Sequence, residues 1–168
     1  MKSPICSFDA KSGVLCSKCE AKLKSGGITQ DDVDVAIKMV RLADRYPEIN
    51  KLTLVRGARV NDEFVLVLRS SDVSMLQSNP ELVNKIEKEL GQKAWFIETE
   101  ASDRRFIENL FDPFKVLSVN FFWLPDSNKL TRVIIADDAR TPPVDIDKVQ
   151  RIAKAVRNIE LLVEFKNK

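Results

Sequence analysis

Apolar residues recur along this chain at two different spacings. At Val33, Ile37 and Val40 they return every three or four positions, which places them on one face of a helix. In the stretch 64–70, FVLVLRS, β-branched and aromatic residues follow one another, as in a strand. The helical spacing predicts helices at residues 29–45, 79–91, 102–111 and 144–158. The extended runs predict strands at residues 52–60, 64–70, 93–98, 115–124, 130–137 and 159–165.

The predicted elements occur in the same order twice: helix, strand, strand, helix, strand. The first strands of the two sets begin at Leu52 and Lys115, so we expect an internal duplication of a small α+β unit. Together with the residues before the first helix, this predicts three parts: an N-terminal segment at 1–28, a first unit at 29–100 and a second unit at 101–168.

All three cysteines lie in the N-terminal segment, within ICSFDAKSGVLCSKCEAKL. Cys16 and Cys19 have the spacing that directs two sulfurs at one metal ion, and Asp9 stands three residues after Cys6, where a second pair would be completed. Carboxylate oxygen is an acceptable zinc ligand. The residues EAKLK after Cys19 indicate a helix, whose N-terminus favours thiolates.

The segment therefore predicts a zinc-knuckle-like site with one structural zinc and the ligands Cys6, Asp9, Cys16 and Cys19. Four protein ligands leave no position for a substrate, so the site is not expected to be catalytic. The alternative is that the site has lost its metal and the cysteines are small buried residues.

The composition indicates where the protein is located and how its charge is distributed along the chain. No apolar run approaches the roughly 18 residues of a membrane span, and MKSPIC is unlike a signal peptide, so we expect a cytoplasmic protein with no membrane partner. Lys and Arg outnumber Asp and Glu by 5 to 2 in residues 1–28 and by 12 to 10 in residues 101–168, but number 10 against 13 in residues 29–100. Contact with nucleic acid is therefore expected at the two ends of the chain.

Three stretches resemble a known family. DRRFIENLFDPFKVLSVNF (103–121) resembles the junction between the two KH domains of NusA transcription factors, and VSMLQSNPELVNKIEKELGQKAWFIE (73–98) resembles the second half of a KH unit. The cysteine segment resembles the N-terminus of archaeal NusA-like KH proteins. The resemblance implies an α+β fold of tandem type II KH-like domains, each a three-stranded sheet backed by helices, after a short zinc-knuckle-like segment. It also implies RNA binding in transcription elongation or termination, alongside RNA polymerase.

The chain departs from this family at the residues that grip RNA. A KH domain clamps the backbone of about four nucleotides with a GxxG loop between two helices. The matching position of the first unit holds Gln77, Ser78 and Asn79 with no glycine, and that of the second unit lies in 139–144, ARTPPV, again with none. Both glycine loops are therefore lost, which leaves Gln77, Ser78 and Asn79 as a degenerate KH loop.

A basic helix face is a second candidate RNA-binding surface. In the helix predicted at 144–158, four cations recur every three residues opposite an apolar face, and Arg140 precedes them. Such a face can bind phosphates without reading sequence, although basic helix faces are commonly just solvated. The candidates are Arg140, Lys148, Arg151, Lys154 and Arg157.

Aromatic residues gather on the strand predicted at 115–124. Phe121 and Trp123 share one face of this strand, and Phe122 takes the other. We expect them to be buried in the core, whereas a set left outward could stack on a base or contact a protein.

Nothing in the sequence favours an enzyme. The chain has no histidine, no GxxxxGK[ST] run and no GxSxG. We therefore expect a non-enzymatic protein with one of two functions. The first is an RNA-associated transcription factor resembling NusA that binds RNA non-specifically through basic surface. The second is a degenerate KH module that docks on RNA polymerase or a ribosomal particle and binds little RNA itself.

Overall fold

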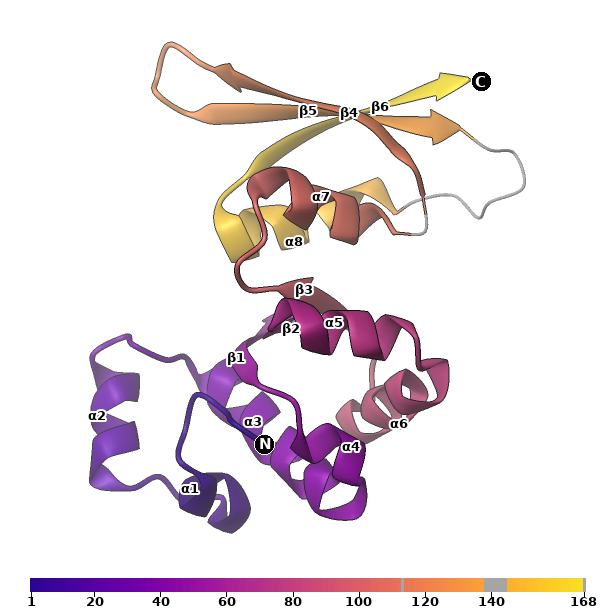
Figure 1. Cartoon of the computed structure of the whole chain (residues 1–168). Coiled ribbons are helices and arrows are strands. Elements are labelled where there is room, and N and C mark those ends of the chain that lie inside the picture. Colours follow the sequence, from indigo (N-terminus) through magenta and orange to yellow (C-terminus); the bar gives the residue numbers. More distant parts are fainter. Residues whose placement is uncertain (113, 138–144, 168) are drawn as a thin grey trace. The chain divides into compact units, whose positions relative to one another are not determined.

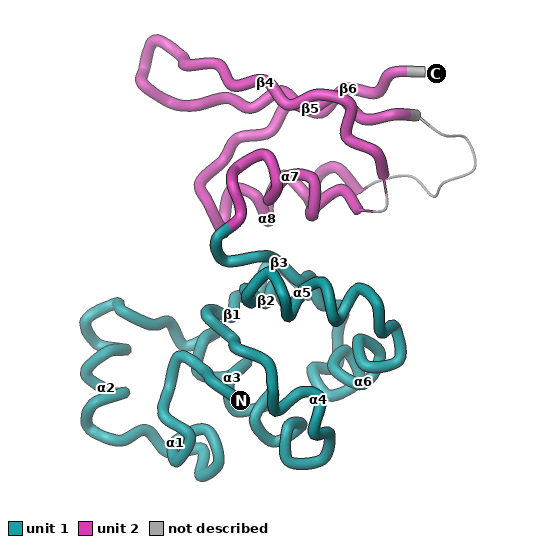
Figure 2. The backbone as a smooth tube through the Cα atoms, in the orientation of Figure 1, with its two compact units in different colours: residues 1–100 teal, residues 101–168 magenta. Residues whose placement is uncertain are grey.

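The structure is a computed structural model that describes residues 1–112, 114–137 and 145–167. The chain forms two compact units, Met1–Glu100 and Ala101–Lys168 (Figure 2). Each unit contains its own three-stranded sheet and its own helices, and each is described by itself below.

Unit 1 holds nine elements (Figure 1). Its sheet has the order β1-β2-β3, with β1 antiparallel to β2 and β2 parallel to β3. A parallel pair needs a crossover connection, which here consists of two successive helices, α5 and α6. In chain order the elements are α1 (Ser7–Ser12), α2 (Ser17–Lys24), α3 (Gln30–Arg45), α4 (Pro47–Asn50), β1 (Leu54–Val60), β2 (Glu63–Leu68), α5 (Ser70–Gln77), α6 (Pro80–Leu90) and β3 (Ala94–Glu98).

Asp32 fixes both the start of α3 and its place against the sheet. It forms a capping box with Thr29, in which the Asp32 N–H donates to the Thr29 hydroxyl at 3.2 Å and the Thr29 N–H donates to the Asp32 carboxylate at 2.8 Å. The same carboxylate, which is buried, accepts from the Gly57 N–H of β1 at 2.7 Å. A Cβ at Gly57 would lie only 2.7 Å from the Cβ of Val35, so α3 and β1 approach closely because Gly57 has no side chain.

The core of unit 1 lies between one face of its sheet and the helices α3, α5 and α6. Phe64, Leu66 and Leu68 alternate along β2 and are buried with Met39 of α3 and Ile86 of α6. The N-terminal segment belongs to the same core, to which it contributes Ile5, Ala10, Cys19 and Ile28. Residues 1–28 therefore pack as part of unit 1.

Unit 2 is smaller and repeats the sheet topology. Its sheet has the order β4-β5-β6, with β4 antiparallel to β5 and β5 parallel to β6. Figure 1 shows α7 and α8 on one face of this sheet, where Phe106, Val133, Ile135 and Ile152 are fully buried. The elements are α7 (Asp103–Phe111), β4 (Val116–Trp123), β5 (Lys129–Asp137), α8 (Ile146–Arg157) and β6 (Glu160–Asn167).

The predicted α+β class is confirmed as two three-stranded mixed sheets backed by helices, with a cysteine cluster at the N-terminus. The predicted element order omitted one helix of the crossover. The strand predicted at 64–70 ends at Leu68, and Ser70 begins α5. This helix gives a weak sequence signal because only Val73, Leu76 and the carboxylate-bearing Asp72 are buried on it. No helix within the described part of the chain is long and apolar enough to cross a membrane.

Candidate metal centre and nucleic-acid interface

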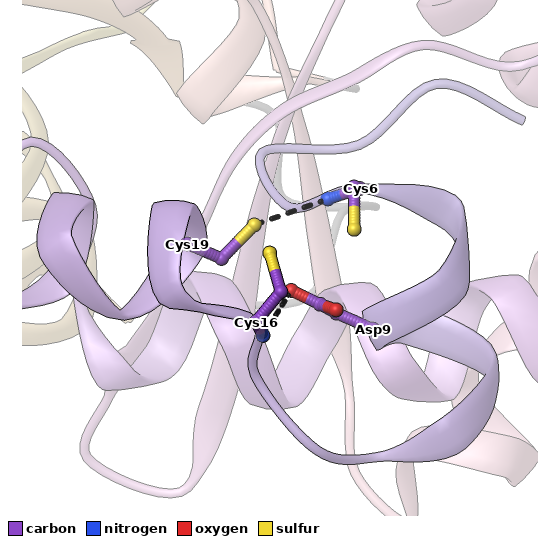
Figure 3. Close-up of side chains that lie close together, drawn as sticks. All are labelled: Cys6, Asp9, Cys16 and Cys19. Carbon is purple, nitrogen blue, oxygen red and sulfur yellow. Dashed lines mark hydrogen bonds between the residues drawn. The ribbon is translucent and has the colours of Figure 1, made fainter.

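The predicted ligands occupy equivalent positions on two short helices. Cys6 is the N-cap of α1 and Cys16 the N-cap of α2, while Asp9 and Cys19 lie three residues further on, in the first turn of each helix. An N-cap side chain and the side chain three residues later both lie at the helix N-terminus. The chain reverses between the helices at Gly13, which has the left-handed φ of 78°. Figure 3 shows the four side chains turned toward one another.

The geometry of this cluster fits a single metal ion. One ligand atom from each of Cys6, Asp9, Cys16 and Cys19 lies within 4.8 Å of all the others. The Cys16 N–H donates to Asp9 Oδ2 at 2.9 Å, and the Cys6 N–H donates to Cys19 Sγ at 3.5 Å. Asp9 Oδ1 is buried and has no hydrogen-bond partner among the described residues. A buried carboxylate oxygen without a partner is unfavourable, and a cation bound to it would remove that cost.

Two pKa values in the cluster are displaced in opposite directions. The hydrogen bond from the Cys16 backbone N–H, helped by that from the Cys19 thiol, lowers the pKa of Asp9 to about 2, so its carboxylate is charged at neutral pH. Burial raises the pKa of the Cys19 thiol to about 12. Cys19 therefore keeps its proton when no cation is near, and a bound metal replaces that proton. All three cysteines are free of disulfides.

The site is attached to the core of unit 1 through α3. Lys11 of α1 forms an ion pair with Asp44 of α3 at 3.7 Å, and the Arg41 guanidinium lies beside Gly13, 3.6 Å from where a Cβ would stand. Ala10 and Cys19 are buried in the core that contains Met39. A metal held here would tie the segment 1–28 to α3, which is a structural role.

The residues predicted to form a degenerate KH loop, Gln77, Ser78 and Asn79, join α5 to α6. Gln77 ends α5 and is exposed. The Ser78 hydroxyl donates to the Ser74 carbonyl at 3.0 Å. Asn79 is the N-cap of α6, and its Oδ1 accepts from the Leu82 N–H at 3.1 Å. Pro80 follows as the first residue of α6 and has no N–H. Two of the three polar side chains of this loop are therefore engaged with the chain itself.

The predicted basic helix face carries several ion pairs. Lys148 lies 3.8 Å from Asp145, Lys154 lies 3.1 Å from Glu160, and Arg157 lies 3.1 Å from Asp103. Arg157 is also stacked on Phe106, 4.7 Å from the ring centre. Arg151 is exposed and forms no ion pair within the described part of the chain. Arg140 lies outside the described residues, as does the second predicted glycine-loop position, 139–144.

Unit 1 has a basic hollow that the sequence pattern did not predict. It has a volume of about 230 Å³ between α3, β1 and β2, and its cations are Lys38, Arg41 and Arg59. Lys38 and Arg59 lie 5.6 and 5.5 Å from the centre of the Phe64 ring. None of these three cations forms an ion pair with another described residue, although Asp31 and Asp34 also line the hollow. The three-residue spacing of Lys38 and Arg41 was visible in the sequence, but the acidic balance of residues 29–100 concealed it.

The expected burial of the aromatic residues on β4 is wrong. Phe121, Phe122 and Trp123 are 41%, 47% and 74% exposed. Phe121 and Trp123 are exposed because the β4–β5 hairpin extends past the helices that cover the sheet (Figure 1), whereas Phe122 lies on the opposite face, which none of the described helices of unit 2 covers. On the helix-facing side of this end lies a second hollow, of about 180 Å³, lined by Trp123, Ser127, Asn128, Lys129, Lys154, Asn158 and Glu160.

No protein-family model and no curated protein matches this chain. One similar solved structure is titled "Crystal structure of APE1850": the TM-score is 0.51, the identity is 15%, and the match covers 76% of this chain and 96% of that chain. The match covers 76% of the 168 residues of this chain, which is more than the 100 residues of unit 1. It therefore includes residues of both units. At this identity the likeness concerns the fold alone.

Proposed function

We propose that this chain is a NusA-like protein of two type II KH-like units that binds RNA non-specifically through basic surface, in transcription elongation or termination. The observation that carries the proposal is the basic hollow of unit 1. Phosphate binding requires cations that are not already neutralised, and the side chains of Lys38, Arg41 and Arg59 form no ion pair with another described residue. The degenerate KH loop offers no comparable group.

The topology of unit 1 supports the KH-like assignment. A helix, two strands, two helices and a third strand follow one another from α3 to β3. The turn at Ser78 and Asn79, between α5 and α6, stands where a KH domain carries its GxxG loop. With that loop altered, RNA would be held by charge rather than by the clamp, which accords with non-specific binding.

The metal in this proposal is one structural zinc held by Cys6, Asp9, Cys16 and Cys19. Three sulfurs and one carboxylate oxygen form a donor set that zinc accepts, and the set is closed. The zinc would hold the segment 1–28 against α3, from which Lys38 and Arg41 project into the basic hollow. We assign the protein no catalytic role.

The test is the salt dependence of binding to a labelled single-stranded RNA, measured by fluorescence anisotropy. The wild-type affinity should fall steeply as salt rises. The triple variant Lys38→Ala, Arg41→Ala, Arg59→Ala should bind more weakly, and the slope of log K against log salt should fall by about 2, or about 0.7 for each lost phosphate contact.

The matched control is Lys22→Ala, Lys51→Ala, Lys88→Ala, which removes the same charge from exposed positions outside the hollow. An equal loss of RNA affinity in the control would mean that binding depends on net charge alone. Absence of any salt-dependent RNA binding by the wild type would refute the proposed function.

A second candidate function is protein docking on RNA polymerase or a ribosomal particle. It is favoured by exposed apolar side chains on the sheet of unit 2: Phe122 and Leu162, 47% and 44% exposed, lie on the face opposite the helices. A native pull-down with and without RNase separates the two functions. Polymerase or ribosomal subunits that persist after RNase favour docking, and partners that vanish with the RNA favour RNA binding.

A further inference from the structure

The hollow at the end of the β4–β5 hairpin is a second candidate site in the described part of the chain. We propose that it binds single-stranded nucleic acid, with one base stacked on Trp123 and the adjoining phosphate on Lys154. This inference rests on the proposed RNA-binding function and names a second site for it, within unit 2.

The ring of Trp123 remains exposed in the folded protein and is therefore available for stacking. It is 74% exposed, more than any other large apolar side chain on the two sheets. It pairs with Lys129 across the hairpin, and that register places it on the helix-facing side of the sheet, opposite Phe122. An exposed indole beside cations is the combination by which single strands are bound, because every base has a π face.

Two lysines border the hollow and differ in how firmly they are held. Lys129 donates to Asp103 at 3.0 Å and lies 4.2 Å from the centre of the Phe121 ring, so it is fixed from two sides. Within the described residues, Lys154 forms a single ion pair, with Glu160 at 3.1 Å, and this pair is exposed. Exposed ion pairs contribute little stability, so Lys154 can exchange Glu160 for a phosphate. Lys129 instead places a fixed positive charge beside Trp123.

Polar groups at the rim suit the edge of a base. Asn158 caps α8 in the left-handed conformation with a φ of 53°, and its side-chain amide forms no hydrogen bond with another described residue. Asn128 is held by Asp126, to which its amide nitrogen donates at 2.8 Å. An amide presents both a donor and an acceptor, so Asn158 can pair with any base edge.

The size of the hollow restricts the ligand. About 180 Å³ is well below the volume of pockets for drug-sized ligands and suits one unpaired base. Bases in a duplex are stacked on one another and cannot reach a single indole. We therefore expect preference for a single strand over a duplex, with little preference among bases.

The experiment detects nucleic-acid binding through the fluorescence emission of Trp123. The chain has two tryptophans, so the full-length variant Trp95→Phe leaves Trp123 as the only indole. Titration of this variant with a short oligoadenylate should quench the emission in a saturable manner. Double-stranded RNA of the same length should quench much less.

Affinity is then measured by anisotropy with matched variants. Trp123→Ala should weaken binding of the single strand by about 5- to 100-fold, and Lys154→Ala should reduce the salt slope by about 0.7. Phe122→Ala, which removes an aromatic ring from the opposite face of the same strand, should leave affinity unchanged.

Each contrary outcome has its own meaning. If the wild type binds RNA and neither the emission of Trp123 nor the Trp123→Ala affinity changes, this inference is wrong and the proposed function stands. If the wild type binds no RNA at any salt concentration, the proposed function fails and this site fails with it. If Trp123→Ala binds RNA normally but no longer retains proteins after RNase treatment, Trp123 is a protein contact and the inference is overturned.

Discussion

The backbone N–H of Cys16 donates to Oδ2 of Asp9 at 2.9 Å and leaves Oδ1 of the same carboxylate buried without a partner among the described residues. The hydrogen bond orients the carboxylate, and one of its oxygens lies within 4.8 Å of each of the three sulfurs. Asp9 thus joins α1 to the start of α2 and supplies the fourth ligand of the proposed zinc site.

Changes at Asp9 should alter metal binding in opposite directions. Asp9→Asn removes the charge and should weaken zinc binding about 10-fold or more, whereas Asp9→Cys supplies a fourth thiolate and should strengthen it. The measurement is zinc content after purification without chelator, followed by competition with a chromogenic chelator. Ser7→Ala, which alters an exposed neighbour that is not a ligand, is the control. Wild-type protein without zinc, unable to take it up, would show that the cluster binds no zinc.

Removal of the metal should destabilise unit 1 and spare unit 2. A metal that binds only the folded state adds its binding free energy to stability. In the Cys16→Ala variant, or in chelator-treated wild type, hydrogen exchange should therefore speed up at the buried strand β2 of unit 1, with little change at β5 of unit 2. Ser17→Ala should behave as the wild type. An equal change at both strands would mean that the two units unfold together.

The sequence predicted which four residues lie together in the cluster, because the spacing of metal ligands is local. Cys6 and Asp9, like Cys16 and Cys19, are three residues apart, and one helical turn brings each pair together. The sheets were also predictable in outline, since the apolar runs that form β2 and β5 have turn residues beside them. Helix α5 was missed because its eight residues bury too few apolar side chains to show a period.

Long-range arrangement was beyond the sequence. Arg59 of β1 lines the same hollow as Lys38 and Arg41 of α3. This arrangement depends on the hydrogen bond between Gly57 and Asp32 and on the close approach of strand and helix at Gly57. In the same way, the cations of α8 are spaced for one face, but Asp103 and Glu160 come from other elements to pair with Arg157 and Lys154. Exposure of Trp123 depends on how far the hairpin extends past α7 and α8, which no local pattern encodes.

Gly57→Ala should destabilise unit 1. The added Cβ would lie 2.7 Å from the Cβ of Val35 in a packed helix–strand contact, and overpacking of this kind costs about 1–3 kcal/mol. The free energy of unfolding from urea titration measures the effect. Gly27→Ala is the matched control, because its new Cβ would be no closer than 3.5 Å to any neighbour. A stability loss in Gly57→Ala no larger than in the control would mean that α3 and β1 can separate without loss.

Asp103 should make the stability of unit 2 depend on pH. Hydrogen bonds from Lys129 and then Arg157, opposed by burial, lower the pKa of Asp103 below its usual value. A carboxyl with a folded-state pKa below its unfolded-state pKa stabilises the fold above the unfolded value, and that stabilisation is lost as the pH falls through the folded value. Because the Asp103 side chain is 38% exposed, the effect at neutral pH should be about 1 kcal/mol or less.

The measurement for Asp103 is the difference in unfolding free energy between wild type and Asp103→Asn, obtained from hydrogen exchange at the buried strand β5 across the acidic range. The difference should be largest at neutral pH and should shrink toward zero as Asp103 of the wild type becomes protonated, since both proteins then carry a neutral group opposite Lys129 and Arg157. Glu48→Gln, at an exposed position in unit 1, corrects for the loss of one negative charge. A difference that stays constant, or grows as the pH falls, would mean that Asp103 supports unit 2 by its shape and hydrogen bonds rather than by its charge.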